Sequence, residues 1–192
     1  MKDKLNFFTN KCDIETIITN ENIINITGMI GSGKTTAANI YRKNSNYLVI
    51  SLDCLFKGQD KENMNPETME INHILKKKYL NKDNKQYFKK YYDEVITYIN
   101  NDHKHRIGVV EGQQIYRFLN INEVRGKLII KRTSIYQCWK RSIKRHLNRK
   151  LISLRKKEIT KKEYLTDVFY WVKRRTVQLK YYRKLNEFIG QI

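Results

Sequence analysis

The segment from residue 28 to residue 35 combines three glycines with a lysine and a hydroxyl side chain. It reads Gly28-Met29-Ile30-Gly31-Ser32-Gly33-Lys34-Thr35, with Thr36 directly after it, and it fits the pattern G-x-x-x-x-G-K-[ST] at every fixed position. Glycines allow the backbone to curl so that successive N–H groups point at one anion, and a helix that begins there adds partial positive charge. The segment therefore predicts a loop that binds the phosphate groups of a nucleotide.

The last two residues of this loop indicate which nucleotide chemistry to expect. The Lys34 ammonium would reach the β- and γ-phosphates, and the Thr35 hydroxyl would ligate a Mg²⁺ ion that bridges the same phosphates. No N-K-x-D motif, which reads guanine in GTPases, follows the loop. We therefore expect ATP and Mg²⁺ at this loop, with GTP left open as the donor.

An aspartate stands at the end of an expected strand. Residues 47–52 (YLVISL) have the composition of a buried strand, and Asp53 follows them in the stretch SLDCLF. In an open α/β sheet, ligands lie outside the carboxyl ends of the strands. Asp53 would then face the γ-phosphate, orient an acceptor hydroxyl and accept its proton, although an aspartate here also suits a turn or a helix cap.

Glu111 ends another expected strand, residues 107–110, and Gly112 follows it. At that edge of the sheet a carboxylate is placed to hold Mg²⁺ or its water ligands, and Gly112 would leave room for a substrate to approach. Two alternatives stay open at this point. Glu111 could contact the acceptor, or it could be a solvated acid with no role in a site.

These residues need a sheet and helices to bring them together. Strand-like runs cover residues 23–27, 47–52, 107–110 and 127–130, and helical patterns cover 34–43, 68–81, 84–100, 134–149 and 161–188. This alternation predicts an α/β fold with a parallel sheet of about four or five strands and helices on both faces. We expect a single domain over residues 1–192, in which residues 1–22 are an N-terminal extension. The last helix should carry one apolar stripe from Leu165 to Leu185.

Length and composition exclude several classes of protein. The 192 residues are 40% hydrophobic, which is enough for a packed core and argues against disorder. No run approaches the roughly 18 consecutive apolar residues of a membrane helix, and the N-terminus lacks the apolar block of a signal peptide. Cys12, Cys54 and Cys138 lie too far apart for a zinc site or a disulfide framework. We expect a cytoplasmic domain with no membrane contact.

The net charge of +20 is concentrated in the C-terminal third. Residues 1–124 hold 18 basic and 15 acidic side chains, whereas residues 125–192 hold 21 basic and 4 acidic ones, a net charge of +17. A composition rich in lysine explains part of this excess, but not why nine of the twelve arginines follow residue 124. The charge predicts either a surface for a polyanion such as nucleic acid or a solvated basic face. Trp171, which lies among these cations, suits helix packing better than base stacking.

Taken together, five motifs resemble those of the small P-loop kinases related to adenylate kinase. They are GMIGSGKTT, SLDCLF, VVEG, TSIYQCWKRSIKR and FYWVKRR, and they span roughly residues 23–188. The nearest resemblance is to the DNA topology modulation protein family, which has a similar LDxLF stretch and an R-x-x-x-R helix. That family usually has Asp-Gly where this chain has Glu111-Gly112. The VVEG form is also similar to uridine kinase-like enzymes.

The resemblance implies a P-loop NTPase fold and assigns roles to residues beyond the loop. It makes Asp53 the base on the acceptor side and Glu111 the acid on the magnesium side. Arg141 and Arg145 match the paired arginines of a mobile lid, which we place at residues 141–160, where they would neutralise charge on the transferring phosphoryl group. Unlike many nucleoside monophosphate kinases, this chain has no acidic residue between positions 141 and 157.

The sequence thus predicts an ATP- and Mg²⁺-dependent phosphotransferase. It would move the γ-phosphoryl group to a nucleotide, a nucleoside or another small hydroxyl or phosphate acceptor. Two alternatives account better for the basic C-terminal third, which could bind nucleic acid. One is a polynucleotide 5′-hydroxyl kinase, and the other is a nucleic-acid-binding regulatory ATPase.

Overall fold

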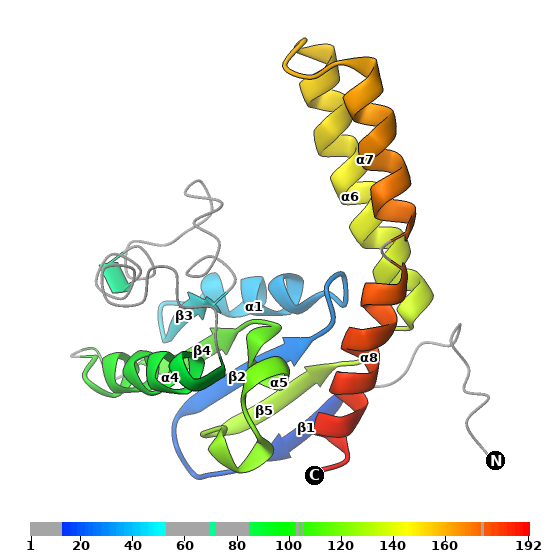
Figure 1. Cartoon of the computed structure of the whole chain (residues 1–192). Helices are drawn as coiled ribbons and strands as arrows, with labels where there is room; N and C mark the ends of the chain where they lie inside the picture. Colours follow the sequence, from blue (N-terminus) through cyan, green and yellow to red (C-terminus); the bar gives the residue numbers. More distant parts are fainter. Residues whose placement is uncertain (1–12, 53–69, 72–84, 103, 105, 174) are drawn as a thin grey trace, which may run out of the picture.

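The computed structural model describes residues 13–52, 70–71, 85–102, 104, 106–173 and 175–192. Its centre is a five-stranded sheet with the strand order β1-β5-β2-β4-β3 (Figure 1). The strands are β1 (Ile14–Ile17), β2 (Ile23–Gly28), β3 (Tyr47–Ser51), β4 (Ile107–Glu111) and β5 (Lys127–Lys131). The last four agree with the runs expected from the sequence to within one residue.

The sheet is mixed, so the expectation of an entirely parallel sheet is wrong at β1. Strand β2 pairs in parallel with β4 and β5, and β3 pairs in parallel with β4, but β1 runs antiparallel to β5. The sequence had assigned no strand to this N-terminal segment. A parallel strand would need a crossover of a dozen or more residues, and only a short turn separates Ile17 from Ile23. That turn is held by the Gly126 N–H, which donates to Thr19 Oγ1 at 2.7 Å.

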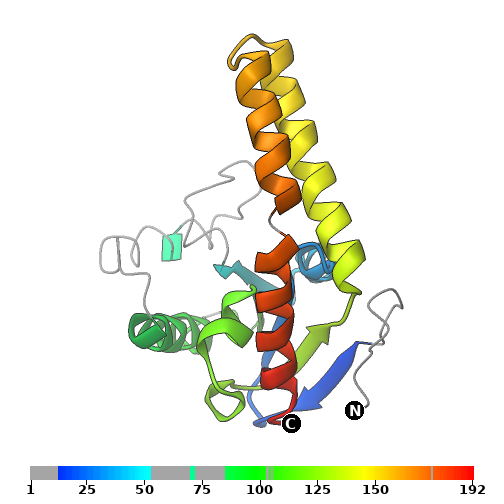
Figure 2. The ribbon, with the colours of Figure 1, turned by 45° about the vertical axis from the view of Figure 1, so that its right-hand side comes forward.

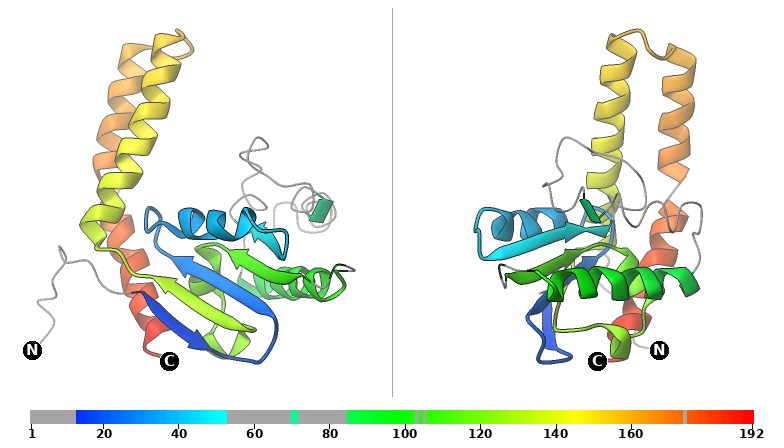
Figure 3. Two further views of the ribbon diagram at one scale, coloured as in Figure 1. Left: turned by 180° about the vertical axis from the view of Figure 1, so that it is seen from behind. Right: turned by 90° about the vertical axis from the view of Figure 1, so that its left-hand side faces the viewer.

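Helices cover both faces of the sheet (Figure 3). They are α1 (Lys34–Arg42), α4 (Lys85–Asn100), α5 (Gln114–Phe118), α6 (Ile135–Arg155), α7 (Lys161–Lys173) and α8 (Arg175–Ile189), with a 3₁₀ turn η2 (Ile121–Glu123). Helix α1 packs on one face, and α4, α5 and α8 pack on the other. In the part of the chain that the structure describes, no helix has both the length and the apolar character needed to cross a membrane.

Neighbouring residues along the strands serve opposite cores. Val49 and Val109 point to the smaller core with Ala38 of α1, whereas Ile50 and Val110 point to the larger core on the side of α4, α5 and α8. Side chains of a strand alternate between its two faces, so a strand buried on both faces is apolar throughout. This explains why the central strands are continuous β-branched runs, and it fixes which edge of the sheet carries their polar ends.

The C-terminal helices differ from the expectation of one long helix over residues 161–188. Helix α6 continues to Arg155, and α7 then returns beside it, so that the two form a hairpin that projects from the sheet (Figures 1 and 2). Helix α8 is a separate element that packs on the sheet. The expected apolar stripe is therefore divided: Leu185 in α8 is buried, but Leu165 and Phe169 in α7 are 55% and 66% exposed.

Two polar contacts define the hairpin. The Lys150 ammonium of α6 lies 2.7 Å from an Asp167 carboxylate oxygen of α7. At the start of α7, the Thr160 N–H donates to Glu163 at 2.7 Å, and the Glu163 N–H donates back to the Thr160 hydroxyl at 3.2 Å. This reciprocal cap satisfies N–H groups that the first turn of a helix leaves unpaired.

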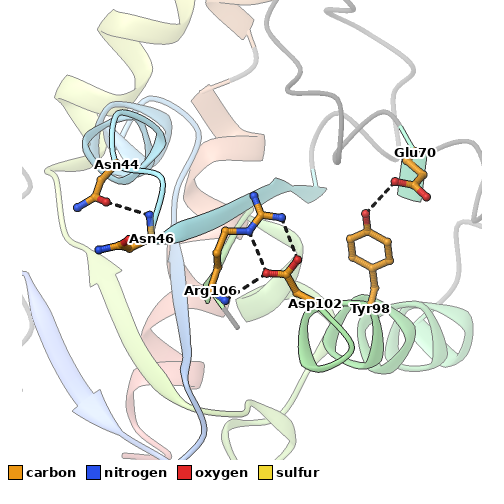
Figure 4. A network of polar contacts seen from close by, with 6 residues as sticks. All are labelled: Asn44, Asn46, Glu70, Tyr98, Asp102 and Arg106. Carbon is orange, nitrogen blue, oxygen red and sulfur yellow. Dashed lines mark hydrogen bonds and ion pairs between the residues drawn. The ribbon is translucent and has the colours of Figure 1, made fainter. Parts of the chain in front are cut away.

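An ion pair between Asp102 and Arg106 lies in the connection from α4 to β4 (Figure 4). The Arg106 guanidinium donates to both carboxylate oxygens of Asp102, at 2.9 and 3.0 Å, and the Arg106 backbone N–H donates to the same carboxylate at 3.1 Å. Both side chains are largely buried, with 12% and 11% exposed. These hydrogen bonds stabilise the charged carboxylate and lower the pKa of Asp102 to about 2.

Replacing Asp102 should destabilise the fold in a pH-dependent way. Asp102→Asn is expected to lower the free energy of unfolding by about 1–2 kcal/mol at neutral pH. Because the folded-state pKa lies below the ordinary value of 3.8, the stabilisation is present above that value and is lost as the pH falls towards 2. Urea unfolding from neutral pH down to acid pH measures this. Exposed Glu187→Gln is the control, and a wild-type advantage that stayed constant with pH would contradict the assignment.

Candidate functional site

The glycine-rich loop of residues 28–35 joins the carboxyl end of β2 to the start of α1. All three of its glycines have positive φ angles, 143° at Gly28, 84° at Gly31 and 95° at Gly33, a conformation that other residues adopt only with strain. Gly31 also lies against the backbone of α6, because a Cβ atom there would stand 2.6 Å from the Cys138 carbonyl oxygen. The loop shape thus depends on glycine, as the sequence pattern predicts.

Beside the loop is a cavity of about 610 Å³, a volume typical of small-ligand sites. Its walls are residues 30–37, Ile40 of α1, Lys131 at the end of β5, and Arg141 and Arg145 of α6. Of the described residues that form these walls, four are cationic and none is acidic. The cavity is therefore suited to an anion that is larger than a single phosphate.

Lys34 is the most buried of these cations, with 5% of its surface exposed. Its ammonium donates to the Met29 carbonyl oxygen at 3.1 Å, so the side chain curls over the loop that precedes it. The Ser32 hydroxyl is also buried, and within the described residues it has no hydrogen-bond partner. A buried hydroxyl without a partner carries a desolvation cost that a bound anion would relieve.

The start of α6 holds the loop from outside. The Thr133 hydroxyl donates to the Ser32 carbonyl oxygen at 3.1 Å, and the Arg141 guanidinium donates to the Gly31 carbonyl oxygen at 3.3 Å. Ser134 caps α6 by accepting from the Gln137 N–H at 3.3 Å. Carbonyl groups of the loop are thus engaged by α6 and the residues just before it, and the same helix brings Arg141 and Arg145 to the cavity that Lys34 and Thr35 also line.

Cys138 lies directly behind the loop, and its thiol is buried. Burial raises the pKa of Cys138 to about 11, and the nearby charges of Lys34 and Arg141 offset only part of that effect. The thiol donates to the Thr133 carbonyl oxygen at 3.7 Å. Cys138 therefore stays protonated at neutral pH and packs against the loop rather than acting as a nucleophile.

Glu111 is 1% exposed, which rules out the alternative of a solvated acid at the end of the strand. The Ser51 hydroxyl, at the end of β3, donates to a Glu111 carboxylate oxygen at 2.5 Å. Glu111 does not itself line the cavity, and among the described residues no three His, Cys, Asp or Glu side chains form a metal-binding group. Thr35, which is exposed, does line the cavity.

The carboxyl ends of β2, β3 and β4 are tied together around this glutamate. The Thr27 hydroxyl of β2 donates to the Gly112 carbonyl oxygen at 2.8 Å, and the Gly112 N–H donates to Ile26 at 3.0 Å. The space beside Gly112 is filled, because a Cβ atom there would lie 2.7 Å from Gln114 and 2.8 Å from Leu52. Gly112 is thus required by packing within the chain, not by the approach of a substrate.

Some expected residues fall outside the described part of the chain, and some site residues were not expected. Asp53 and the expected helix near residues 68–81 belong to the first group, except for residues 70–71. Lys131 and Ile40 line the cavity but were not predicted, although the position of Lys131 at a strand end could have indicated it. Lys131 also forms an ion pair with Asp13, so the segment before β1 reaches the rim of the cavity.

Comparisons with known proteins add nothing to this geometry: no protein-family model matches the chain, and neither a curated protein nor a solved structure shows significant similarity to it. The resemblance to P-loop kinases therefore stays an expectation from the motifs, and the site is judged on its own contacts.

Gly31 and Gly33 allow a matched test of the loop. Gly33→Ala places a Cβ atom in open space and should cost only the strain of positive φ, about 1–2 kcal/mol. Gly31→Ala adds the collision with the Cys138 backbone, so we expect a loss of about 3–4 kcal/mol together with weaker nucleotide binding. Urea unfolding and titration with a fluorescent ATP analogue measure the two effects. Equal losses from both variants would show that the loop does not pack on α6 as described.

Proposed function

We propose that this chain is an ATP- and Mg²⁺-dependent phosphotransferase with the P-loop NTPase fold. It transfers the γ-phosphoryl group to a hydroxyl or phosphate acceptor of the nucleotide or nucleoside class. The observation that carries the proposal is one cavity lined by the glycine-rich loop, by Lys34, and by Arg141 and Arg145 of α6. Several cations around one anion site match the demands of phosphoryl transfer, where charge must be neutralised on both β- and γ-phosphates.

The topology supports the proposed fold. The four parallel strands follow the order β5-β2-β4-β3, and the loop leaves the carboxyl end of β2, which lies between two neighbours that come later in the chain. At such a position the connections from adjacent strands diverge, and ligands of open α/β sheets bind in the crevice there. The polar residues Glu111, Ser51 and Thr27 end their strands at this same edge.

The residues present fit the triphosphate of ATP. Among the described residues, the buried Ser32 hydroxyl and the Lys34 ammonium are donors with no acidic residue in the cavity lining, and the N-terminus of α1 adds partial positive charge. Lys34 donates to the Met29 carbonyl oxygen. In our proposal it turns this ammonium to the β- and γ-phosphates, and the loop closes around them.

The Thr35 hydroxyl would hold Mg²⁺ together with phosphate oxygens, and Glu111 would act on the ion indirectly. When bound, the ion neutralises part of the charge on the phosphates. Glu111 is buried and hydrogen-bonded to Ser51, so it suits an indirect role in orienting water better than direct contact with the acceptor. The family resemblance is the basis for adding Asp53 as the acceptor-side base.

Arg141 and Arg145 are proposed to stabilise the transition state. Both are exposed side chains at the cavity wall, and they stand one helical turn apart on α6. Charge that develops on the transferring group would be neutralised by their guanidinium groups, which in related chemistry contributes about 10³-fold or more in rate. The Arg141 contact with the Gly31 carbonyl oxygen at 3.3 Å already couples α6 to the phosphate loop.

A transfer assay tests this proposal. With γ-labelled ATP, Mg²⁺ and a mixture of nucleosides and nucleoside monophosphates, label should appear on an acceptor. Arg145→Gln should lower kcat about 10²- to 10³-fold with little change in ATP affinity, whereas Lys34→Ala should abolish ATP binding. Arg183→Gln, an exposed arginine of α8, is the matched control. Release of free phosphate alone, or full activity of Arg145→Gln, would contradict the assignment.

Asp53→Asn tests the role that the resemblance gives to this residue. If Asp53 accepts the proton of the acceptor, the variant should lose about 10²-fold or more in kcat and still bind ATP. Isothermal titration with a non-hydrolysable ATP analogue and single-turnover transfer would separate the two effects. Unchanged transfer by the variant would remove Asp53 from the mechanism and leave the phosphate-binding residues in place.

A further inference from the structure

Helix α6 is strongly basic along its whole length. It contains no acidic residue, and six of its seven Lys and Arg side chains are exposed, namely Lys140, Arg141, Lys144, Arg145, Arg149 and Arg155. The seventh, Lys150, pairs with Asp167 of α7. The cavity uses only two of these exposed cations, so the function proposed above leaves most of the charge unexplained.

Part of this charge forms a continuous row, which we call the outer stripe. Arg141, Arg145 and Arg149 follow one another at intervals of four residues, and Ile152 and Lys156 continue the same face of the helix. The row begins at the cavity, which Arg141 and Arg145 line. With a rise of about 1.5 Å per residue it runs roughly 20 Å along the projecting hairpin (Figure 1).

The hairpin that carries the outer stripe contains only three acidic residues. Its acidic residues are Glu158, Glu163 and Asp167. Asp167 pairs with Lys150, and Glu163 accepts hydrogen bonds from Thr160 at the start of α7. Exposed cations in a row attract a polyanion and raise its local concentration.

A nucleic acid strand matches this row better than an isolated phosphate compound does. A mononucleotide would be held by the cavity alone, whereas a strand presents a line of phosphates that can follow Arg141, Arg145 and Arg149, spaced about 6 Å apart along the helix, and reach Lys156 about 10 Å further on. A strand also offers apolar base faces. Two exposed apolar residues lie along the path: Ile152 in the stripe is 52% exposed, and Ile40 at the cavity is 71% exposed.

We propose that the outer stripe binds the sugar–phosphate backbone of a single-stranded nucleic acid, with the 5′ end of the strand at the cavity, where its terminal hydroxyl is the phosphoryl acceptor. The second half of this inference rests on the proposed function. In the transfer, the 5′ oxygen bonds to the γ-phosphorus, the bond from that phosphorus to the β–γ bridging oxygen breaks, and ADP leaves with the electron pair. The hydroxyl proton passes to the acceptor-side base of the proposed function and from there to solvent.

Binding is tested without any nucleotide or metal. The probe is an oligothymidylate of about a dozen nucleotides, a length that such sites accommodate, with a fluorophore on its 3′ end and a free 5′ hydroxyl. The double variant Arg149→Gln/Lys156→Gln removes two cations of the outer stripe that lie beyond the cavity. We expect its Kd, measured by anisotropy, to rise about tenfold, and its salt dependence to become shallower by about 1.4 log units per log unit of salt.

The matched control removes two exposed cations from α8, in Lys180→Gln/Arg183→Gln, and it has the same net charge as the stripe variant. This control should bind the probe like the wild-type protein. An equal loss of affinity in both double variants, or no binding by the wild-type protein, would overturn the inference. Oligouridylate as a second probe distinguishes RNA from DNA, and binding to either strand supports the stripe.

Transfer then separates this inference from the proposed function. With γ-labelled ATP and Mg²⁺, label on a 5′-hydroxyl oligonucleotide, reduced in the stripe variant and not in the α8 variant, supports both halves of the inference. Label on free nucleosides with none on the oligonucleotide overturns the second half and leaves the phosphotransferase intact. Strand binding at the stripe without transfer to any acceptor would contradict the proposed function. It would also overturn the second half of the inference, transfer to the 5′ hydroxyl, and would leave the first half, strand binding, in place.

Discussion

The contact between the phosphate loop and α6 is the constraint on which the rest of the site depends. Gly31 lies so close to the Cys138 backbone that no side chain fits between them, and the carbonyl oxygens of Gly31 and Ser32 accept from Arg141 and Thr133. One helix, with the residues just before it, therefore fixes the outer wall of the loop and also supplies two of the cations that line the cavity. Because α6 follows β5 after only a short connection, the position of those cations is set by the sheet.

The sheet contributes a second constraint by gathering the polar ends of its strands. Glu111 is buried, and Ser51 and Thr27 link the strand ends around it. A carboxylate held in this way is oriented by hydrogen bonds before any ligand arrives, which lowers the reorganisation that binding or catalysis would require. The buried ends of β2, β3 and β4 are hydrogen-bonded to one another, whereas the hairpin of α6 and α7 contacts the sheet only at its base (Figure 2). The glycine-rich loop and the basic hairpin thus meet at the start of α6.

The hairpin shows where local sequence patterns stop being informative. The helical pattern over residues 161–188 was correct in kind, since α7 and α8 occupy nearly all of it. It did not reveal that α7 turns away from the sheet, because periodicity reports which residues share a face and not what that face contacts. Leu165 and Phe169 belong to the same apolar stripe as Leu185. Leu185 is buried, yet Leu165 and Phe169 are exposed. Likewise, β1 escaped prediction because Glu15 and Lys127 form an exposed ion pair at an edge strand, where the apolar signal is weak.

The sequence alone determined the glycine-rich loop, the four central strands and the concentration of cations after residue 124. Each of these follows from local chemistry: positive φ angles need glycine, strands buried on both faces need continuous apolar runs, and charge can be counted directly. Only the tertiary structure decided that Lys131 and Ile40 line the cavity and that Glu111 is buried and hydrogen-bonded to Ser51. It also decided that β1 adds to the edge of the sheet in the antiparallel direction. These features depend on pairings between residues far apart in the chain, and such pairings are selected by packing and connection length rather than by the pattern of any one segment.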